Sequence, residues 1–150
     1  MENYKAFTQS LYSLGNIDFS VLLNNCTSVE YVVLSKLEMC MTDENLDYVN
    51  VTQLSVKLGV SVPAVSRVLR SLEEKKYIER NVDIFCRRNT RVKLTKAGKK
   101  ELSKCQNNLD KFFSEIFSDL EETEQKVMAH SFQIMCDRMQ TKIKEYKEEV

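Results

Sequence analysis

Hydroxyl and guanidinium side chains gather on one side of a predicted helix in the middle of the chain. Val65, Leu69 and Leu72 recur at helical spacing and form its apolar side, so the serines and arginines between them face the other way. Such groups can hydrogen-bond to base edges in a major groove and to phosphate oxygens. The candidate DNA-contacting residues of this stretch are Ser61, Pro63, Ala64, Ser66, Arg67 and Arg70.

A shorter helix must end just before this one begins. Val51 and Leu54 share a face of the shorter helix, and Gly59 can adopt the left-handed conformation that ends it. Ser61 can cap the next helix with its hydroxyl, and Pro63 falls in the first turn, where a missing N–H is tolerated. This pattern is typical of a helix-turn-helix. A helical hairpin with an ordinary solvated face is the alternative interpretation.

Two short strands are predicted after the second helix. Residues 77–81 form the first, and in the second, residues 91–95, Val92 and Leu94 alternate with charged residues. The polar segment 82–90 between them contains two adjacent arginines. Helix, turn, helix and basic hairpin is the order of a winged helix-turn-helix. The candidate DNA-contacting residues of the hairpin are Arg87, Arg88 and Arg91.

About fifty residues, from Val51 to Lys100, resemble the MarR family of bacterial transcription regulators. The matching segments are Ser66-Arg67, Leu72-Glu73-Glu74-Lys75, Ile78-Glu79-Arg80 and Val92-Lys93-Leu94-Thr95-Lys96-Ala97-Gly98. The resemblance implies a sequence-specific repressor that binds a pseudo-palindromic operator in double-stranded DNA as a homodimer. Activation is the alternative, because the sign of regulation depends on where the operator lies.

The same resemblance implies release of DNA by a small aromatic or anionic effector. Such a molecule would bind between the DNA-binding lobe and the dimerisation helices. Aromatic residues near that junction are the candidates for its pocket, and an ordinary core position is the alternative for each. They are Tyr12, Phe19 and Tyr31.

The chain departs from the family pattern at two places. Lys76 stands where the family usually has glycine before the first wing strand, so we expect a left-handed conformation that lysine adopts at a cost. Cys86-Arg87-Arg88 stands where the family has an Asp-x-Arg motif. This replacement retains the arginine but removes the carboxylate that orients it. We therefore expect a wing that is more basic and less rigidly held.

Net positive charge is confined to the predicted DNA-binding region. The whole chain has 22 Lys and Arg and 22 Asp and Glu. Residues 51–104 contain 14 basic and 5 acidic residues, a balance of +9, and the remainder contains 8 and 17, a balance of −9. This separation favours phosphate binding over a solvated helix face, on which the signs usually mix.

Apolar stripes at both ends of the chain predict helices that need a partner subunit. Tyr4, Phe7 and Leu11 share a face near the N-terminus, and longer stripes through Phe112 and Ile134 follow the wing. A monomeric bundle closed by the first helix is the alternative. We expect a mainly α fold, a winged helix-turn-helix with N- and C-terminal dimerisation helices. It would form a single domain of residues 1–150, with the DNA-binding lobe at 28–100 and the dimerisation helices at 1–20 and 101–150.

Enzymatic and metal chemistry have little support in the sequence. His130 is the only histidine, so no histidine pair is available for zinc, and 3 glycines cannot supply a phosphate-binding loop. We expect no enzyme activity, no metal and no cofactor. The chain does not begin with a basic region and an apolar run, and no segment has the roughly 20 apolar residues of a membrane span. A cytoplasmic location without membrane contact is therefore expected.

Two of the five cysteines are candidates for a redox-sensing thiol. Cys86 lies beside two arginines in the predicted hairpin tip, and positive charge favours the reactive thiolate. Cys26 is a second candidate near the end of the first helical region. A thiol-based oxidant-sensing regulator is thus one alternative function. A winged-helix protein-interaction module, whose wing docks an acidic partner, is the other.

Overall fold

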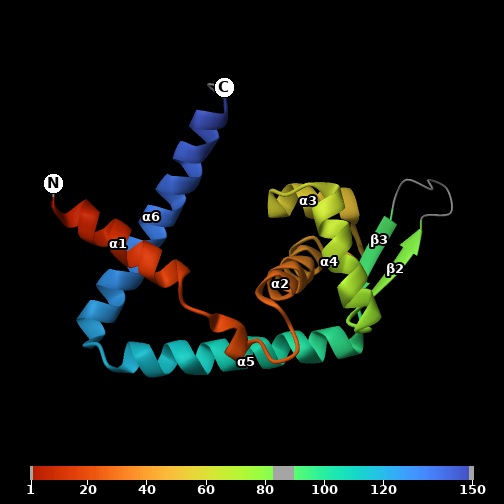
Figure 1. The fold of residues 1–150 in the computed structure, drawn as a ribbon, viewed down its shortest axis with the longest axis horizontal. Helices are drawn as coiled ribbons and strands as arrows, with labels where there is room; N and C mark the ends of the chain where they lie inside the picture. Colours follow the sequence, from red (N-terminus) through yellow and green to blue (C-terminus); the bar gives the residue numbers. More distant parts are fainter. Residues whose placement is uncertain (1, 83–89, 149–150) are drawn as a thin grey trace. The chain divides into compact units, whose positions relative to one another are not determined.

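The computed structural model describes residues 2–82 and 90–148 of the chain. It divides into two compact units, Met1–Leu109 and Asp110–Val150. The elements labelled in Figure 1 are α1 (Glu2–Gly15), α2 (Ser28–Asp43), α3 (Val51–Leu58), α4 (Val62–Glu74), β2 (Ile78–Val82), β3 (Thr90–Leu94), α5 (Lys96–Ser118) and α6 (Glu122–Glu148). A 3-10 helix η1 (Phe19–Leu22) and a short strand β1 (Val49–Asn50) complete the order. The predicted domain boundary at residue 100 falls inside α5, which runs from the first unit into the second.

The start of α2 is held by a capping box. The Glu30 N–H donates to Thr27 Oγ1 at 3.2 Å, and the Thr27 N–H donates to Glu30 Oε2 at 2.8 Å, which satisfies two free amides of the first turn. Apolar residue type alone does not decide which side chains of α2 are buried, because Val29 and Val32 are 58% and 52% exposed whereas the charged Glu30 is buried.

The turn between α3 and α4 follows the predicted pattern. Gly59 ends α3 with φ +68°, in the left-handed region that favours glycine, and Pro63 lies in the first turn of α4. Ser61 occupies the N-cap position with an extended backbone, but its side chain makes no capping hydrogen bond. The predicted Ser61 cap is therefore wrong, which leaves the hydroxyl available to other partners.

The end of α4 contains a left-handed lysine. Lys76 has φ +61°, as expected from the family resemblance, in which glycine usually stands at this position. The Tyr77 N–H donates to the Leu72 carbonyl at 2.9 Å and the Lys76 N–H donates to the Glu73 carbonyl at 2.9 Å, which is a Schellman motif. This reversal directs the chain from α4 straight into β2.

A three-stranded antiparallel sheet follows, in the order β1-β3-β2. Val92 pairs with Val49 on one side and with Arg80 on the other, and the buried Val92 and Leu94 alternate with half-buried Arg91 and Lys93. Both wing strands are confirmed. Together with the helices they form the predicted fold, a mainly α winged helix-turn-helix.

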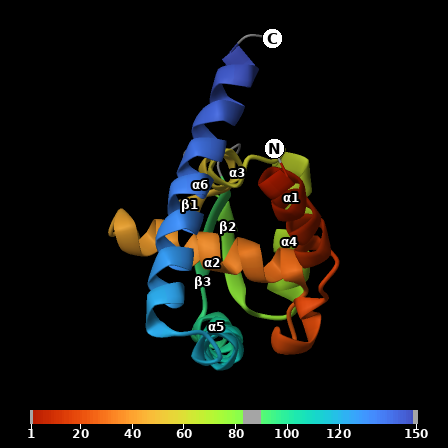
Figure 2. The same cartoon turned by 90° about the vertical axis from the view of Figure 1, so that its left-hand side faces the viewer.

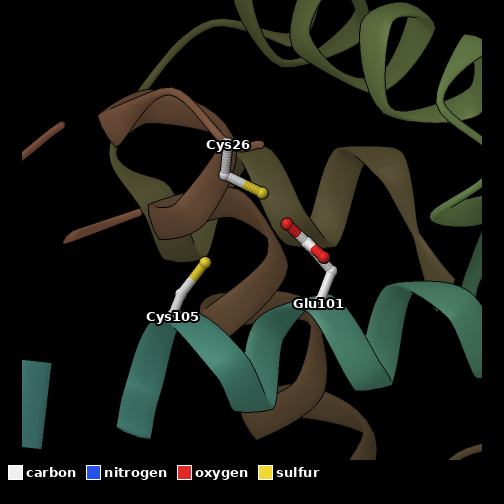
Figure 3. A group of neighbouring side chains, drawn as sticks. All are labelled: Cys26, Glu101 and Cys105. Carbon is white, nitrogen blue, oxygen red and sulfur yellow. The ribbon is translucent and has the colours of Figure 1, made fainter. Parts of the chain in front are cut away.

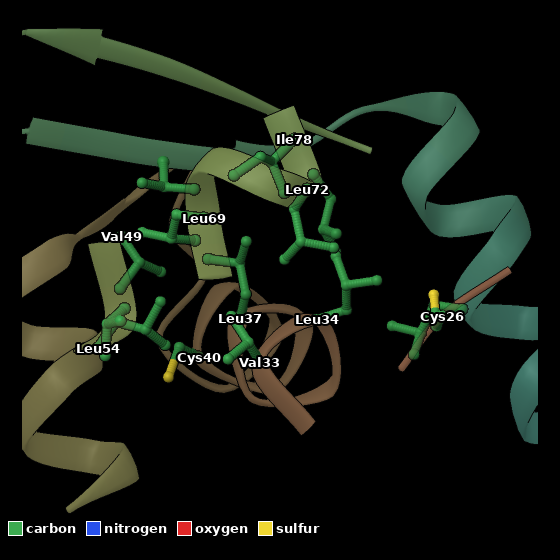
Figure 4. Close-up of a cluster of buried hydrophobic side chains, with 14 of the residues drawn as sticks. Cys26, Val33, Leu34, Leu37, Cys40, Val49, Leu54, Leu69, Leu72 and Ile78 are labelled. Carbon is green, nitrogen blue, oxygen red and sulfur yellow. The ribbon is translucent and has the colours of Figure 1, made fainter. Parts of the chain in front are cut away.

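One hydrophobic core joins these elements. Large, fully buried side chains come from α2, α3, α4 and the first half of α5, and Figure 4 shows many of them around α2. Figure 2 shows α2 crossing in front of the strands, and α2 contacts both β1 and β3. The fully buried leucines are Leu34, Leu37, Leu54, Leu69, Leu72 and Leu102. This packing buries the side of α4 that carries Leu69 and Leu72 and leaves the other side of the helix exposed to solvent.

The second unit consists of the end of α5 and the whole of α6. Gln125 Nε2 donates to the carbonyls of Phe117 and Leu120, at 2.9 and 3.0 Å, and so closes the turn between the two helices. None of the described α6 residues is buried. Large apolar side chains are exposed along it, including Val127, Met128, Phe132, Ile134, Met139, Ile143 and Tyr146. In residues 2–82 and 90–148, no helix has the length and apolar composition that crossing a membrane requires.

Candidate nucleic-acid interface

The outer face of α4 presents two exposed arginines from a rigidly packed helix. Arg67 and Arg70 lie opposite Val65 and Leu69, whose side chains are 1% and 0% exposed. Within the described part of the chain, neither arginine has a carboxylate partner within ion-pair distance. Their charge is therefore available to a ligand outside this unit.

The remaining predicted residues of the turn and helix surround these arginines in the sequence. Ser61 and Pro63 are exposed, and Ala64 and Ser66 are half-buried. The structure thus places all six candidates from this stretch at or near the solvent surface, five of them at the N-terminal part of α4 and Arg70 about one turn further along. This is the part of a second helix that touches base edges in helix-turn-helix complexes.

Other basic residues of the unit are partly neutralised. Lys93 Nζ lies 3.0 Å from Glu79 Oε2 across β3 and β2, and Arg80 Nη1 lies 3.6 Å from Glu73 Oε2. Both pairs involve exposed carboxylates, so each contributes little to stability. They do reduce the net positive charge beside the α4 face.

Arg91 is held against an aromatic ring that was not among the predicted site residues. Its guanidinium carbon lies 4.1 Å from the centroid of the Tyr48 ring, a cation–π contact. Tyr48 immediately precedes β1, and β1 pairs with β3 so that Asn50 lies opposite Arg91. The two side chains also line a hollow of about 200 Å³ on the outer side of the sheet. A strand of two residues carries too weak a pattern to have revealed this contact.

The other two arginines of the predicted wing, Arg87 and Arg88, lie outside the described residues, as does Cys86. Their roles in DNA contact and in redox sensing stay predictions.

An open hollow of about 470 Å³ lies between the start of α2 and α4. Ala64, Arg67 and Ser71 line it from α4, and Thr27, Val29 and Glu30 from α2. The buried Glu30 carboxylate in its wall is already engaged by Ser71 Oγ at 2.6 Å and by Lys75 Nζ at 2.7 Å. Its charge is thus satisfied within the protein.

The three predicted effector-pocket residues lie on different elements. Tyr12 on α1 is 77% exposed, Phe19 in η1 is half-buried, and Tyr31 on α2 packs against the core. The hollows beside Arg67 and Arg91 are lined by other residues. A pocket formed by these aromatic residues therefore stays a prediction.

Cys26 does not have the environment of a reactive thiol. It is 5% exposed, and its surroundings raise its pKa to about 12, first through burial and then through the nearby Cys105 and the carboxylates of Glu30 and Glu101. A reactive cysteine requires exposure and a lowered pKa. The structure thus argues against the expectation of a redox-sensing Cys26, because burial disfavours the thiolate.

A family model described as a winged helix DNA-binding domain matches residues 29–113, which is more than half of the chain. The chain belongs to this family. The match covers α2, the helix-turn-helix, the wing strands and most of α5. This winged helix DNA-binding domain therefore includes the exposed face of α4 and the Arg91–Tyr48 contact. No curated protein sequence matches the chain.

Solved structures resemble this winged helix DNA-binding domain and its flanking helices. MepR, a transcription regulator of the Staphylococcus aureus multidrug efflux pump MepA, superimposes with a TM-score of 0.68 and 23% identity over 93% of this chain and 98% of its own. A mutant MarR from E. coli superimposes with a TM-score of 0.67 and 18% identity, over 86% of this chain and 95% of its own. A mutant S. aureus MepR bound to an oligodeoxyribonucleotide superimposes with a TM-score of 0.59 and 23% identity, over 93% of this chain and 98% of its own. The fold expected from the MarR-family resemblance is thereby confirmed.

Proposed function

We propose that this protein is a homodimeric, sequence-specific transcription regulator of the MarR type, and a repressor where its operator overlaps a promoter. The observation that carries the proposal is the exposed Arg67 and Arg70 face of α4 within a winged helix DNA-binding domain. The solved structure of a similar MepR bound to an oligodeoxyribonucleotide supports the DNA ligand. In this proposal the protein works in the cytoplasm as a DNA-binding protein and not as an enzyme.

In this proposal the N-terminal part of α4 enters the major groove. Arg67 contacts a base edge and Arg70 a phosphate, while Ser61, Pro63, Ala64 and Ser66 pack against bases or the adjacent backbone. Arg91, positioned by Tyr48, contacts the backbone beside the site. Arg87 and Arg88 extend toward the minor groove. The phosphate contacts supply affinity, and the base-edge contacts of α4 supply sequence preference.

The dimer in this proposal is formed by helices outside the DNA-binding lobe. Tyr4 and Tyr12 on α1 are 60% and 77% exposed, and α6 exposes a series of large apolar side chains. Burying these surfaces against a second copy would remove the largest apolar stripes from water. A two-fold dimer would then place two α4 helices about 34 Å apart and read a pseudo-palindrome.

A small aromatic or anionic effector that shifts the separation of the two lobes is a further element of the proposal. Tyr12, Phe19 and Tyr31 are its candidate contacts. An effector of this kind would lower DNA affinity only if it binds the DNA-free arrangement more tightly.

The test begins with selection of bound duplexes from a random pool by the purified protein. A pseudo-palindromic consensus with half-sites about 10 base pairs apart is expected. Binding of that duplex should weaken steeply with salt, because each phosphate contact releases counterions. Sequence-independent binding, or no DNA binding, would contradict the proposed regulator.

Single substitutions then test the α4 face on the selected duplex. Arg67→Ala should weaken binding by about 1–3 kcal/mol and relax the preference at one base position. Arg70→Ala should weaken binding to all duplex sequences alike, and should reduce the slope of log affinity against log salt concentration by about 1. Lys144→Ala, an exposed lysine of α6 outside the matched domain, removes the same charge and serves as the control. Equal effects of Arg67→Ala and Lys144→Ala would refute the assignment.

A further inference from the structure

Three buried side chains with metal-binding atoms meet at the junction of α2 and α5. Cys26 lies in the segment between η1 and α2, and Glu101 and Cys105 lie one turn apart on the same face of α5. Figure 3 shows the two sulfur atoms and the carboxylate directed toward a common space. One ligand atom from each residue lies within 4.8 Å of the other two, and the three residues are 5%, 5% and 0% exposed.

We propose that Cys26, Glu101 and Cys105 form a binding site for a thiophilic divalent cation of the zinc class. Sulfur and carboxylate oxygen are ligand types that zinc takes in proteins, at about 2.3 and 2.0–2.2 Å from the metal. Two sulfur ligands of a tetrahedral zinc lie about 3.8 Å apart. The two sulfur atoms must therefore approach by at most about 1 Å, which side-chain rotation on α5 and in the irregular segment before α2 allows.

The carboxylate of Glu101 is a buried charge with weak compensation. Its Oε1 accepts a hydrogen bond from the Asn25 N–H at 3.1 Å, and its Oε2 lies 3.5 Å from Lys104 Nζ, whose side chain is 49% exposed. A carboxylate at this depth requires a close opposite charge. A divalent cation between Glu101 and the two sulfur atoms would supply it.

The two thiols are also arranged to become ligands. Cys105 Sγ donates to the Leu23 carbonyl at 3.1 Å, so its sulfur is already oriented toward the segment that carries Cys26. Metal binding would convert both thiols to thiolates with release of two protons. Three protein ligands leave a fourth tetrahedral position for water.

This site does not depend on DNA contact, because none of its residues lies on the outer face of α4. The wide spacing of its residues along the chain explains why no metal site was expected from the sequence. Cys26 is 79 residues from Cys105, so no Cys-x-x-Cys spacing marks the pair.

The test uses the full chain, reduced with a phosphine and freed of metal by a chelator. Zn²⁺ is titrated in competition with a chromophoric chelator, and Co²⁺ is added separately because thiolate ligands give it an intense sulfur-to-metal absorption. One Zn²⁺ per chain, thiolate absorption with Co²⁺ and a raised melting temperature with Zn²⁺ are expected. Absence of saturable 1:1 binding would overturn the proposal.

Variants identify the ligands. Cys26→Ala and Cys105→Ala should each abolish tight Zn²⁺ binding and the cobalt–thiolate band, whereas Cys40→Ala, which removes an equally buried cysteine from α2, should retain both. Glu101→Gln keeps both thiols and tests the site even if a cysteine variant fails to fold. We expect it to lower the Zn²⁺ affinity at least about tenfold. Wild-type affinity in Glu101→Gln, or in a folded Cys26→Ala or Cys105→Ala protein, would overturn the proposed site.

Discussion

Lys75 Nζ lies 2.7 Å from Oε2 of the buried Glu30, so the end of α4 is tied to the start of α2 by an ion pair. Ser71 Oγ donates to the other carboxylate oxygen at 2.6 Å, and Lys75 Nζ also donates to the Asn25 carbonyl at 2.9 Å. Glu30 simultaneously caps α2 through Thr27. One buried carboxylate thus fixes the position of the candidate DNA-binding helix relative to α2.

Replacing Lys75 by methionine should destabilise the protein. The substitution preserves most of the aliphatic side chain but leaves the Glu30 carboxylate buried without its cation. We expect a loss of about 2 kcal/mol in the free energy of unfolding, measured by urea denaturation. The Glu30→Gln and Lys75→Met double variant should lose less than the sum of the two single losses. Additive losses would show that the two side chains do not interact.

The same pair predicts how stability depends on pH. Burial acts to raise the pKa of Glu30, but hydrogen bonds from Lys75, Ser71 and the Thr27 backbone outweigh it and hold the pKa below the ordinary 4.5. A lowered carboxyl pKa stabilises the fold above pH 4.5, and this contribution is lost as the pH falls through the lower folded-state value. The Glu30 hydrogen bond raises the pKa of Lys75 above 10.5, although burial opposes it, so the lysine contribution is lost only above that pH.

Urea denaturation at a series of pH values checks this dependence. Below pH 4.5 the wild type should lose stability more steeply than Glu30→Gln, because only the wild type protonates this carboxyl group on acidification. Glu74→Gln, at an exposed position of α4, is the control and should follow the wild type. Parallel wild-type and Glu30→Gln profiles would be inconsistent with the lowered pKa.

Replacing Lys76 by glycine should stabilise the protein. Lys76 has φ +61°, and the other described non-glycine residues with positive φ are Asn24 and Asn45, a residue type that tolerates this region better. Removing the Cβ should relieve about 1 kcal/mol of backbone strain. Lys100→Gly, at an exposed position inside α5, is the matched control and should instead lose about 1 kcal/mol. Destabilisation by Lys76→Gly would show that the lysine side chain contributes more than its backbone conformation costs.

Replacing Gly98 by alanine should destabilise the junction of the wing and α5. A Cβ at Gly98 would lie 2.0 Å from the Tyr77 carbonyl oxygen, and Thr95 holds α5 in place by donating from its N–H to that same oxygen at 3.0 Å. The required backbone shift should cost about 1–3 kcal/mol by thermal or urea denaturation. Gly15→Ala, where a Cβ would meet nothing within 4 Å, is the control and should change stability little. Equal stability of the two variants would contradict the close approach.

Replacing Tyr48 tests whether its ring positions Arg91 for DNA. Tyr48→Leu removes the cation–π contact and should weaken binding to the selected duplex by about 0.5–1 kcal/mol, whereas Tyr48→Phe keeps the ring and should bind like the wild type. In an Arg91→Ala background, Tyr48→Leu should have no further effect on DNA affinity. An undiminished effect in that background would assign Tyr48 a role separate from Arg91.

Local chemistry in the sequence determined the helix-turn-helix and the wing strands. Gly59 and Pro63 act within one or two residues of themselves, and Val92 and Leu94 alternate with charges along a single strand. Patterns of this kind involve only residues close together in the sequence, so they can be recognised without knowledge of the fold. The left-handed backbone at Lys76 was expected from the family resemblance, in which glycine usually occupies this position, and not from its neighbours in the sequence.

Tertiary packing alone decided which side chains of α2 are buried and which distant residues meet. Val29 and Val32 are apolar yet exposed, whereas the charged Glu30 is buried beside the end of α4, where Ser71 and Lys75 supply partners for its carboxylate. Strand β1 exists because β3 pairs with it, as two residues have no pattern of their own. The grouping of Cys26, Glu101 and Cys105 likewise arises only when α5 packs beside the segment before α2, because contacts across such chain separations leave no periodicity to detect.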